Sequence, residues 1–186
     1  AGFLGRRLAK ELLRRGRLIG LSGEAEAIDE LVLFDIAAAS PPLDDRRVRN
    51  LAGDIADPAE LKALIAPGTA SVFHLAAVVS AGAEADFDLG YRINLDGTRG
   101  LLEACRALPK PLRLVFASSV ATYGGEIPDT VTDATAQTPE TSYGAQKTIG
   151  ELLVNDYSRK GFIDGRSLRL PTITVRPSKQ NKAASG

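Results

Sequence analysis

The stretch Ser142-Tyr143-Gly144-Ala145-Gln146-Lys147 places a phenol and an ammonium group four residues apart. Apolar residues at helical spacing follow it, so we expect a helix in which Tyr143 and Lys147 share one face. A lysine beside a tyrosine favours the phenolate and so lowers the tyrosine pKa. Such a tyrosine can exchange a proton with an alcohol near neutral pH. The pair fits a surface or packing role equally well, and the rest of the chain has to decide between these interpretations.

Apolar runs and helical patterns alternate along the chain. Strands are expected at 31–35, 48–51, 71–77, 112–117 and 166–170. Helices are expected up to Gly16, over 58–65 and 86–108, and from Tyr143 to about Lys160, with loops at 20–30 and 124–141. Strands that alternate with helices predict an α/β fold, a Rossmann-like doubly wound parallel sheet.

The chain begins with two glycines three residues apart, Gly2 and Gly5, at the start of a predicted helix. They match the second half of a G-x-x-G-x-x-G turn, in which the backbone approaches a pyrophosphate at a helix N-terminus. A simple tight turn explains them as well. The first strand and first glycine of such a turn do not precede them, so we expect the sequence to be a piece of a longer chain.

Asp35 ends the second apolar run of such a fold. An acid at this place accepts hydrogen bonds from the adenosine ribose and repels a 2′-phosphate, which favours NAD over NADP. Asp35 also fits the role of a turn cap. Arg6 and Arg7 argue against the NAD preference, because an arginine near the glycine turn can accept a 2′-phosphate; a solvated helix face explains them equally.

Three further polar positions stand out. His74 lies inside a predicted strand, where we expect a buried core histidine without a catalytic or metal partner. Asn94 interrupts a predicted helix, in which asparagine is a poor interior residue, so it is either a polar link to the lysine or a solvent-facing side chain. Ser118 and Ser119 follow a predicted strand, where ligands bind in open α/β sheets, or they form the turn.

The composition excludes several classes of function. The formal net charge is zero, which leaves no electrostatic footprint for nucleic acid or an anionic membrane. Cys105 is the single cysteine, so an internal disulfide is impossible, no metal site is indicated, and a reduced, cytoplasmic setting is expected. No apolar run approaches the length of a membrane span, and no signal peptide is visible.

Seven motifs occur together in a fixed order. They are Ala-Gly-Phe-Leu-Gly at 1–5, Asp35, Gly53-Asp54-Ile55, His74-Leu75-Ala76-Ala77, Asn94-Leu-Asp-Gly-Thr, Ser118-Ser119 and Tyr143-x-x-x-Lys147. In order and spacing the chain resembles the extended short-chain dehydrogenase/reductases, also called the NAD-dependent epimerase/dehydratase family, over essentially its whole length. The family includes sugar-nucleotide epimerases and dehydratases, so membership does not fix the reaction.

The resemblance implies a role for each matching residue. The pyrophosphate of NAD would contact Gly2, Phe3, Leu4 and Gly5. Its adenosine ribose would contact Asp35, and its adenine would contact Asp54 and Ile55. Leu75, Ala76 and Ala77 would line the cofactor, and Pro171 and Thr172 would lie at its nicotinamide end. Asn94 would be a structural and proton-relay residue, and Ser119 would hydrogen-bond the reacting oxygen. Tyr143 would be the acid/base, and Lys147 would bind the nicotinamide ribose and lower the tyrosine pKa.

Two departures point to a narrower group of the family. Gln146 replaces the serine or threonine common before the lysine, and the segment 169–177 departs from the usual Asn-Val-Tyr-Gly-Pro. Together with residues 76–80 and 84–88, they look like the D-erythronate dehydrogenases, which oxidise a four-carbon sugar acid at C2 with NAD. Ser178 stands where that group has glycine. The substrate would contact Ser119, Tyr143, Arg176, Asn181 and Lys182, and its carboxylate would pair with Arg176, Lys179 or Lys182, unless these bases are a solvated loop.

We therefore expect an NAD-dependent oxidoreductase that oxidises a secondary alcohol of a small, D-erythronate-like sugar acid. The alternatives are a nucleotide-sugar epimerase or dehydratase that recycles its NAD, and a non-catalytic NAD-binding scaffold. Residues 1–175 would form the NAD-binding domain and 176–186 the start of a substrate-binding region. The resemblance also implies a homodimer built on the helices of Asn94 and Tyr143.

Overall fold

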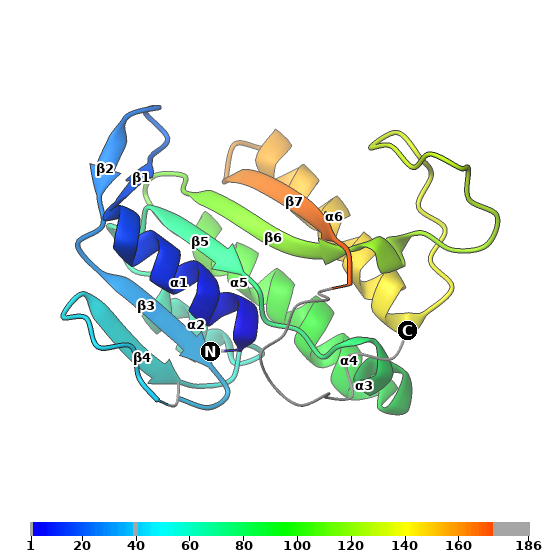
Figure 1. Cartoon of the computed structure of the whole chain (residues 1–186), viewed down its shortest axis with the longest axis horizontal. Coiled ribbons are helices and arrows are strands. Elements are labelled where there is room, and N and C mark those ends of the chain that lie inside the picture. The colour runs from blue at the N-terminus through cyan, green and yellow to red at the C-terminus, as the bar shows by residue number, and fades with distance from the viewer. Residues whose placement is uncertain (1, 39–40, 173–186) are drawn as a thin grey trace.

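The computed structural model describes residues 2–38 and 41–172 and has helices on both faces of parallel strands (Figure 1). The strands are β1 (Arg17–Ile19), β2 (Ala25–Ala27), β3 (Leu31–Asp35), β4 (Val48–Ala52), β5 (Ser71–His74), β6 (Arg113–Ser119) and β7 (Asp164–Leu170). The helices are α1 (Phe3–Arg15), α2 (Pro58–Leu64), α3 (Ser80–Ala85), α4 (Phe87–Tyr91), a π-helical turn η1 (Arg92–Asp96), α5 (Gly97–Arg106), a 3₁₀ turn η2 (Val120–Thr122) and α6 (Ser142–Arg159).

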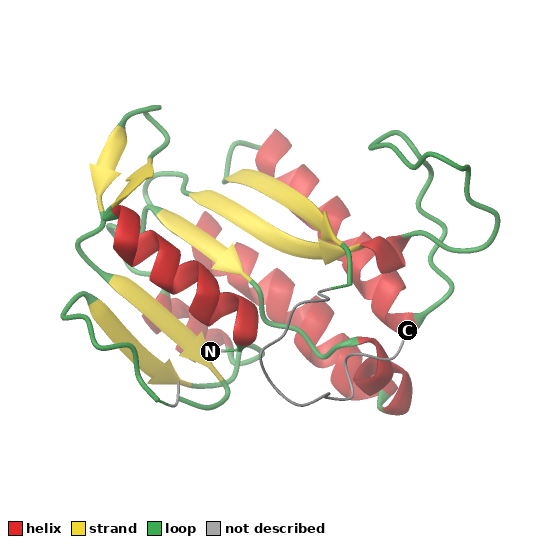
Figure 2. Ribbon diagram, in the orientation of Figure 1, coloured by secondary structure: helices red, strands yellow, loops and turns green. Residues whose placement is uncertain are grey.

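The strands form two parallel blocks and one hairpin within the described residues. β3 pairs with β4, and β5, β6 and β7 pair in that order, all in parallel. β1 and β2 form a separate antiparallel hairpin. Figures 1 and 2 show α1 on the near face and α2, α5 and α6 behind the strands. Helices on both faces of parallel strands confirm the predicted doubly wound Rossmann-like fold.

The core lies where β6 meets α2, α5 and α6. Every second residue of β6 is buried, with Leu114 and Phe116 at most 1% exposed. They pack with Leu61 of α2, Leu102 of α5 and Val154 of α6. Alternation along β6 therefore fixes which side chains face α6, and this positions the candidate site.

Local signals in the sequence place several element ends correctly. Asp57 caps α2 by accepting hydrogen bonds from the amides of Ala59 and Glu60, with Pro58 in the first turn. Gly16 ends α1 in the left-handed region, with φ of 67°. Both signals depend on residues next to each other in the chain, so they need no tertiary contact to be recognised.

The predicted helix over 86–108 is present as a continuous run over 87–106, but it contains a π turn that its pattern did not predict. It is divided into α4, η1 and α5, and the amide of Gly97 bonds to the carbonyl of Arg92, five residues back. A π turn inserts one extra residue and re-aims the side chains that follow. The helix α3 was not predicted, because its sequence of small residues has no apolar periodicity.

Two other boundaries differ from the expectation. The segment 20–30, expected to be a loop, contributes β2 to the hairpin. The strand expected over 71–77 ends at His74, because its pairing with β6 ends at Phe116, and residues 75–79 lead instead into α3. Ser118 and Ser119 belong to β6, and Ser119 also caps the turn η2 that follows.

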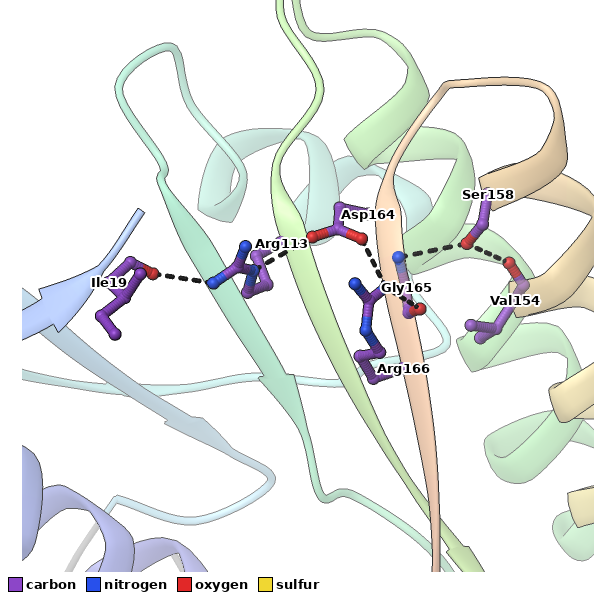
Figure 3. Close-up of polar contacts among 7 residues, drawn as sticks. All are labelled: Ile19, Arg113, Val154, Ser158, Asp164, Gly165 and Arg166. Carbon is purple, nitrogen blue, oxygen red and sulfur yellow. Dashed lines mark hydrogen bonds and ion pairs between the residues drawn. The ribbon is translucent and has the colours of Figure 1, made fainter. Parts of the chain in front are cut away.

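A polar cluster fastens the amino ends of β6 and β7 (Figure 3). Arg113 donates to Asp164 Oδ2 at 3.1 Å and to the carbonyl of Ile19 at 3.0 Å, which ties the hairpin to the sheet. Ser158 Oγ accepts from the amide of Gly165 at 3.1 Å and so joins α6 to β7. These contacts stabilise the amino ends of the strands, at the opposite end of the sheet from the carboxyl ends of β6 and β7.

Candidate active site

The first turn of α6 brings Tyr143 against the end of β6. Thr141 caps this helix, and its Oγ1 accepts from the amide of Gly144 at 3.0 Å. A Cβ atom on Gly144 would lie 2.1 Å from the carbonyl oxygen of Ala121. Glycine therefore lets the helix backbone touch the turn η2 that follows Ser119, which no larger residue permits.

Lys147 is buried beneath this turn. It is 2% exposed, and its Nζ donates to the carbonyl of Ala117 at 2.8 Å. The same nitrogen lies 4.6 Å from the ring centre of Phe116 and 5.6 Å from that of Tyr143. Burial lowers the pKa of Lys147 to about 8. Lys147 is therefore protonated below about pH 8, and its ammonium lies close to both Tyr143 and the end of β6.

Tyr143 does not have the lowered pKa that the sequence predicted. Burial raises the pKa of Tyr143 above its usual value, and a hydrogen bond with Ser119 offsets part of that rise. In this structure the loss of hydration outweighs any benefit from Lys147, whose own charge is destabilised by burial. Tyr143 is therefore a neutral phenol near pH 7 that donates or accepts one hydrogen bond.

Ser119 is both a turn former and a neighbour of Tyr143. It is the last residue of β6, and its Oγ accepts from the amide of Ala121 at 3.1 Å. The turn-forming interpretation is thus confirmed, and it does not exclude the contact with the phenol. The hydroxyl is fixed at the carboxyl end of a central parallel strand, the edge at which ligands bind in such sheets.

Asn94 is buried rather than solvent-facing. It is 2% exposed and lies in the π turn η1. Its amide exchanges two hydrogen bonds with the backbone of Val78, at 2.8 and 2.9 Å, and donates to Gln146 Oε1 at 2.7 Å. Asn94 therefore reaches α6 through Gln146, while Ser119, Tyr143 and Lys147 lie directly together.

Two charged residues of this region, Glu151 and Arg169, were not predicted as site residues from the sequence. Arg169 donates to both oxygens of Glu151 at 2.8–3.1 Å, and Ser118 also donates to that carboxylate. Tyr143, Lys147 and Glu151 occupy one stripe of α6 and contact three consecutive residues of β6, Ser119, Ala117 and Ser118. The four-residue spacing beyond Lys147 is the signal that could have found Glu151.

The predicted cofactor residues lie around the carboxyl ends of the strands. Gly2 is the N-cap of α1, and Phe3, Leu4 and Gly5 form its first turn. Asp35 ends β3. Leu75, Ala76 and Ala77 follow β5 and are half-buried, whereas Pro171 and Thr172 follow β7 and are exposed. Arg6 donates to the carbonyl of Pro41 at 2.5 Å, which brings α1 close to the segment after β3.

Asp54 and Ile55 both contact the helix that carries Asn94. Asp54 accepts from Arg92 at 2.6 Å and from the amide of Ala56 at 2.8 Å, and these bonds lower its pKa. Ile55 packs against Gly97, where a Cβ atom would lie 3.1 Å from the isoleucine methyl group. The predicted substrate residues Arg176, Asn181 and Lys182, as well as Ser178 and Lys179, lie outside the described residues.

The family of the chain follows from a match along almost all of its length. Residues 1–183 match the model of the NAD dependent epimerase/dehydratase family. The chain belongs to this family. The chain is 60% identical over 185 residues to the D-erythronate dehydrogenase of Cupriavidus necator, and it spans 56% of that protein's length.

Solved structures agree with this assignment. The chain is similar to the nucleoside-diphosphate-sugar epimerase from Agrobacterium tumefaciens, with a TM-score of 0.89 and 44% identity over all of this chain and 54% of that one. It is also similar to a UDP-glucose 4-epimerase from Brucella ovis in complex with NAD, with a TM-score of 0.74 and 30% identity over 91% of this chain and 49% of that one.

The donor set of this epimerase/dehydratase family member fits a dinucleotide. The first turn of α1 contains no acidic residue and no side-chain cap, so its backbone amides can donate to an anionic pyrophosphate. The Lys147 ammonium has three N–H donors. Within the described residues it donates one hydrogen bond, to the carbonyl of Ala117, which leaves donors for a ligand. Apart from its chain neighbours, no described residue has an atom within 4 Å of a Cβ position on Gly2, which leaves room for a ligand beside this backbone.

Arg6 and Arg7 do not form a phosphate cradle in this structure. With Phe3 and Lys10 they line a surface depression of about 310 Å³ on one face of α1. Arg6 is bonded to the backbone of Pro41, and Arg7 lies over the ring of Phe3 at 5.4 Å. The solvated-face interpretation therefore describes them better than the 2′-phosphate one.

His74 is the buried core histidine that the sequence predicted. It is 3% exposed, and its Nε2 lies 2.8 Å from Thr98 Oγ1. Burial, together with the charge of Lys147, lowers the pKa of His74 to about 3. Residues 2–38 and 41–172 contain no group of three potential metal ligands, and none of their helices is long and apolar enough to cross a membrane.

Proposed function

We propose that the chain forms the NAD-binding and proton-transferring part of a dehydrogenase that oxidises a secondary alcohol of a small, D-erythronate-like sugar acid. The observation that supports it most is the meeting of Ser119, Tyr143 and buried Lys147 at one strand end. The name of the relative at 60% identity supports the sugar-acid substrate.

The chain's own residues divide the work of this reaction. NAD, when bound, supplies the acceptor for a hydride. Ser119 holds the substrate hydroxyl by a hydrogen bond. Tyr143, as the phenolate, takes the hydroxyl proton while hydride leaves the carbinol carbon for the cofactor. Lys147 lowers the cost of forming that phenolate beforehand, because its ammonium lies within 6 Å of the ring centre. Asn94 keeps the neighbouring helix in place.

The cofactor contacts in this proposal follow the carboxyl edge of the sheet. The first turn of α1 (Gly2, Phe3, Leu4 and Gly5) holds the pyrophosphate, Asp35 the adenosine ribose, and Asp54 with Ile55 the adenine. Leu75, Ala76, Ala77, Pro171 and Thr172 line the rest. Residues 1–175 form this domain, and 176–186, with Arg176, Asn181 and Lys182, begin the substrate-binding region.

Spectrophotometric assay of NADH formation tests the reaction. The full-length protein is given NAD and a panel of four- to six-carbon aldonates, and separately UDP- and dTDP-sugars. We expect NADH with a four-carbon acid and none with the nucleotide sugars. No turnover with any aldonate contradicts the proposal.

The second candidate is a nucleotide-sugar epimerase with recycled NAD. The similarity to the Agrobacterium tumefaciens structure favours it. It predicts that NAD co-purifies with the protein and that a nucleotide sugar is converted without net reduction. A non-catalytic scaffold, in contrast, predicts binding of NAD and no conversion of any kind.

We further propose a cytoplasmic homodimer built on the helices of Asn94 and Tyr143. Leu152, on α6, is 60% exposed and supports an apolar contact there. Light scattering after size exclusion should give twice the mass of one chain. In Leu152→Glu the measured mass should fall to that of one chain. An unchanged mass in that variant places the contact elsewhere.

A further inference from the structure

We propose that Gln146 is a positioning residue, which ties the segment expected to line the cofactor to the helix of Tyr143 and Lys147 by way of Asn94. The inference rests on the proposed function for the roles of these two catalytic residues. The hydrogen-bond arrangement that carries it is independent of the substrate.

The backbone of Val78 fixes the orientation of the Asn94 amide. The amide of Val78 donates to Asn94 Oδ1 at 2.8 Å, and Asn94 Nδ2 donates to the Val78 carbonyl at 2.9 Å. A backbone N–H can only donate and a carbonyl can only accept, so a flipped Asn94 amide would lose both bonds. One proton of Nδ2 is thereby left to point at α6.

The orientation of Gln146 follows from that of Asn94. Asn94 Nδ2 donates to Gln146 Oε1 at 2.7 Å. Gln146 therefore presents its oxygen to Asn94, and its Nε2 is buried without a hydrogen-bond partner in the described part of the chain. Nε2 packs against Gly90, where a Cβ atom would come within 2.8 Å of it.

An unpartnered amide donor in a fully buried side chain is destabilising. An apolar side chain of the same length would avoid that cost. An apolar residue cannot, however, accept a hydrogen bond from Asn94. The bond that Oε1 accepts is therefore the contribution for which the glutamine is needed.

This bond connects three parts of the site. Val78 directly follows Leu75, Ala76 and Ala77, which are expected to line the cofactor. Asn94 lies in the π turn η1, and Gln146 immediately precedes Lys147 in α6. Breaking the bond should therefore loosen the 75–79 segment relative to the catalytic helix.

Two substitutions on either side of Lys147 test this role. Gln146→Met removes the acceptor for Asn94 at nearly constant volume. Thr148→Val is the matched control, because Thr148 Oγ1 is also buried but has no hydrogen-bond partner among the described residues. The readouts, in the full-length protein, are hydrogen exchange at the amide of Val78, the Kd for NAD, and kcat and KM measured separately.

We expect Gln146→Met to speed exchange at Val78 about tenfold and to raise the Kd for NAD by a similar factor, equivalent to about 1.4 kcal/mol. Thr148→Val should change both by less than about twofold. Unchanged exchange and Kd in Gln146→Met, or equal changes in both variants, would overturn the proposal.

Gln146→Glu keeps an acceptor oxygen toward Asn94 and should leave exchange at Val78 at the wild-type level. Loss of protection in this variant also contradicts the proposal, even if Gln146→Met does not fold. Absence of sugar-acid oxidation would reject the proposed function alone, because the exchange and NAD-binding measurements do not require turnover.

Discussion

At Tyr143, burial and chemistry act in opposite directions. Burial raises the pKa of the phenol, which protects the neutral form, whereas the proposed reaction passes through a phenolate. Lys147 is the compensating group, because its buried ammonium is stabilised as soon as a negative charge forms beside it. Tyr143 has to lose its own proton before it can accept one from the substrate, and the ammonium of Lys147 lowers the cost of that ionisation.

Replacement of Tyr143 by phenylalanine tests the role of the hydroxyl. We expect kcat to fall by a factor of at least about 100, because general-base catalysis is lost. NAD affinity should remain within about threefold, since packing of the ring is retained. Isothermal titration and steady-state kinetics measure the two effects, and retained turnover would remove Tyr143 from the mechanism.

His74 should make the fold sensitive to acid. Its pKa is lowered from 6.5 to about 3 by burial and by Lys147. Between these values the unfolded chain binds more protons, so stability falls as the pH falls, by up to about 1.4 kcal/mol per pH unit. Urea unfolding at neutral and at mildly acidic pH should show this loss, and His74→Gln should reduce it. An identical acid sensitivity in both proteins would contradict the assignment.

At the scale of elements, α6 is held to the sheet by an ion pair as well as by apolar packing. The Glu151 side chain is 5% exposed and that of Arg169 is 22% exposed. We expect Glu151→Ala to lower the free energy of unfolding by about 3 kcal/mol, because the buried Ser118 hydroxyl loses its acceptor and the Arg169 guanidinium loses its charge partner, although it still donates to Tyr123.

The control for this substitution is Glu11→Ala in α1. Glu11 pairs with Arg14 and Arg15, but its side chain is 42% exposed. Its loss should have a much smaller effect, because exposed ion pairs contribute little to stability. Equal effects of the two substitutions in denaturant unfolding would mean that the Glu151 pair contributes no more than a surface pair.

The contact between α6 and η2 depends on Gly144. Gly144→Ala should destabilise the protein by about 1–3 kcal/mol and lower kcat, because the new methyl group meets the carbonyl of Ala121. Gly100→Ala, in α5, is the control, since its methyl group would meet only the movable end of Leu61 at 3.1 Å. Thermal unfolding distinguishes the two, and a stable, active Gly144→Ala protein would show that the turn is not rigid.

The sequence predicted those features that depend on neighbouring residues or on a regular period. The cap at Asp57 and the strand that ends at Asp35 are examples. The π turn at Asn94 was not predictable in this way, because the pattern of 86–108 is helical throughout. Glu151 was missed because its partner Arg169 lies on another element, 18 residues along the chain.

At the scale of the whole molecule, one of the residues that suggested a substrate is not placed to touch it. Gln146 pointed to sugar acids by resemblance, yet it is fully buried and bonded to Asn94. Its link to substrate preference is therefore indirect. The chain spans 56% of its D-erythronate dehydrogenase relative, and recognition of the sugar acid remains a proposal.

Transfer of deuterium from C2 of labelled D-erythronate tests the central proposal most directly. The full-length protein is incubated with NAD and the labelled acid, and the products are analysed by mass spectrometry. We predict that the label appears in released NADH and is absent from the oxidised acid. Label that stays in, or returns to, the sugar carbon without net NADH would contradict the account.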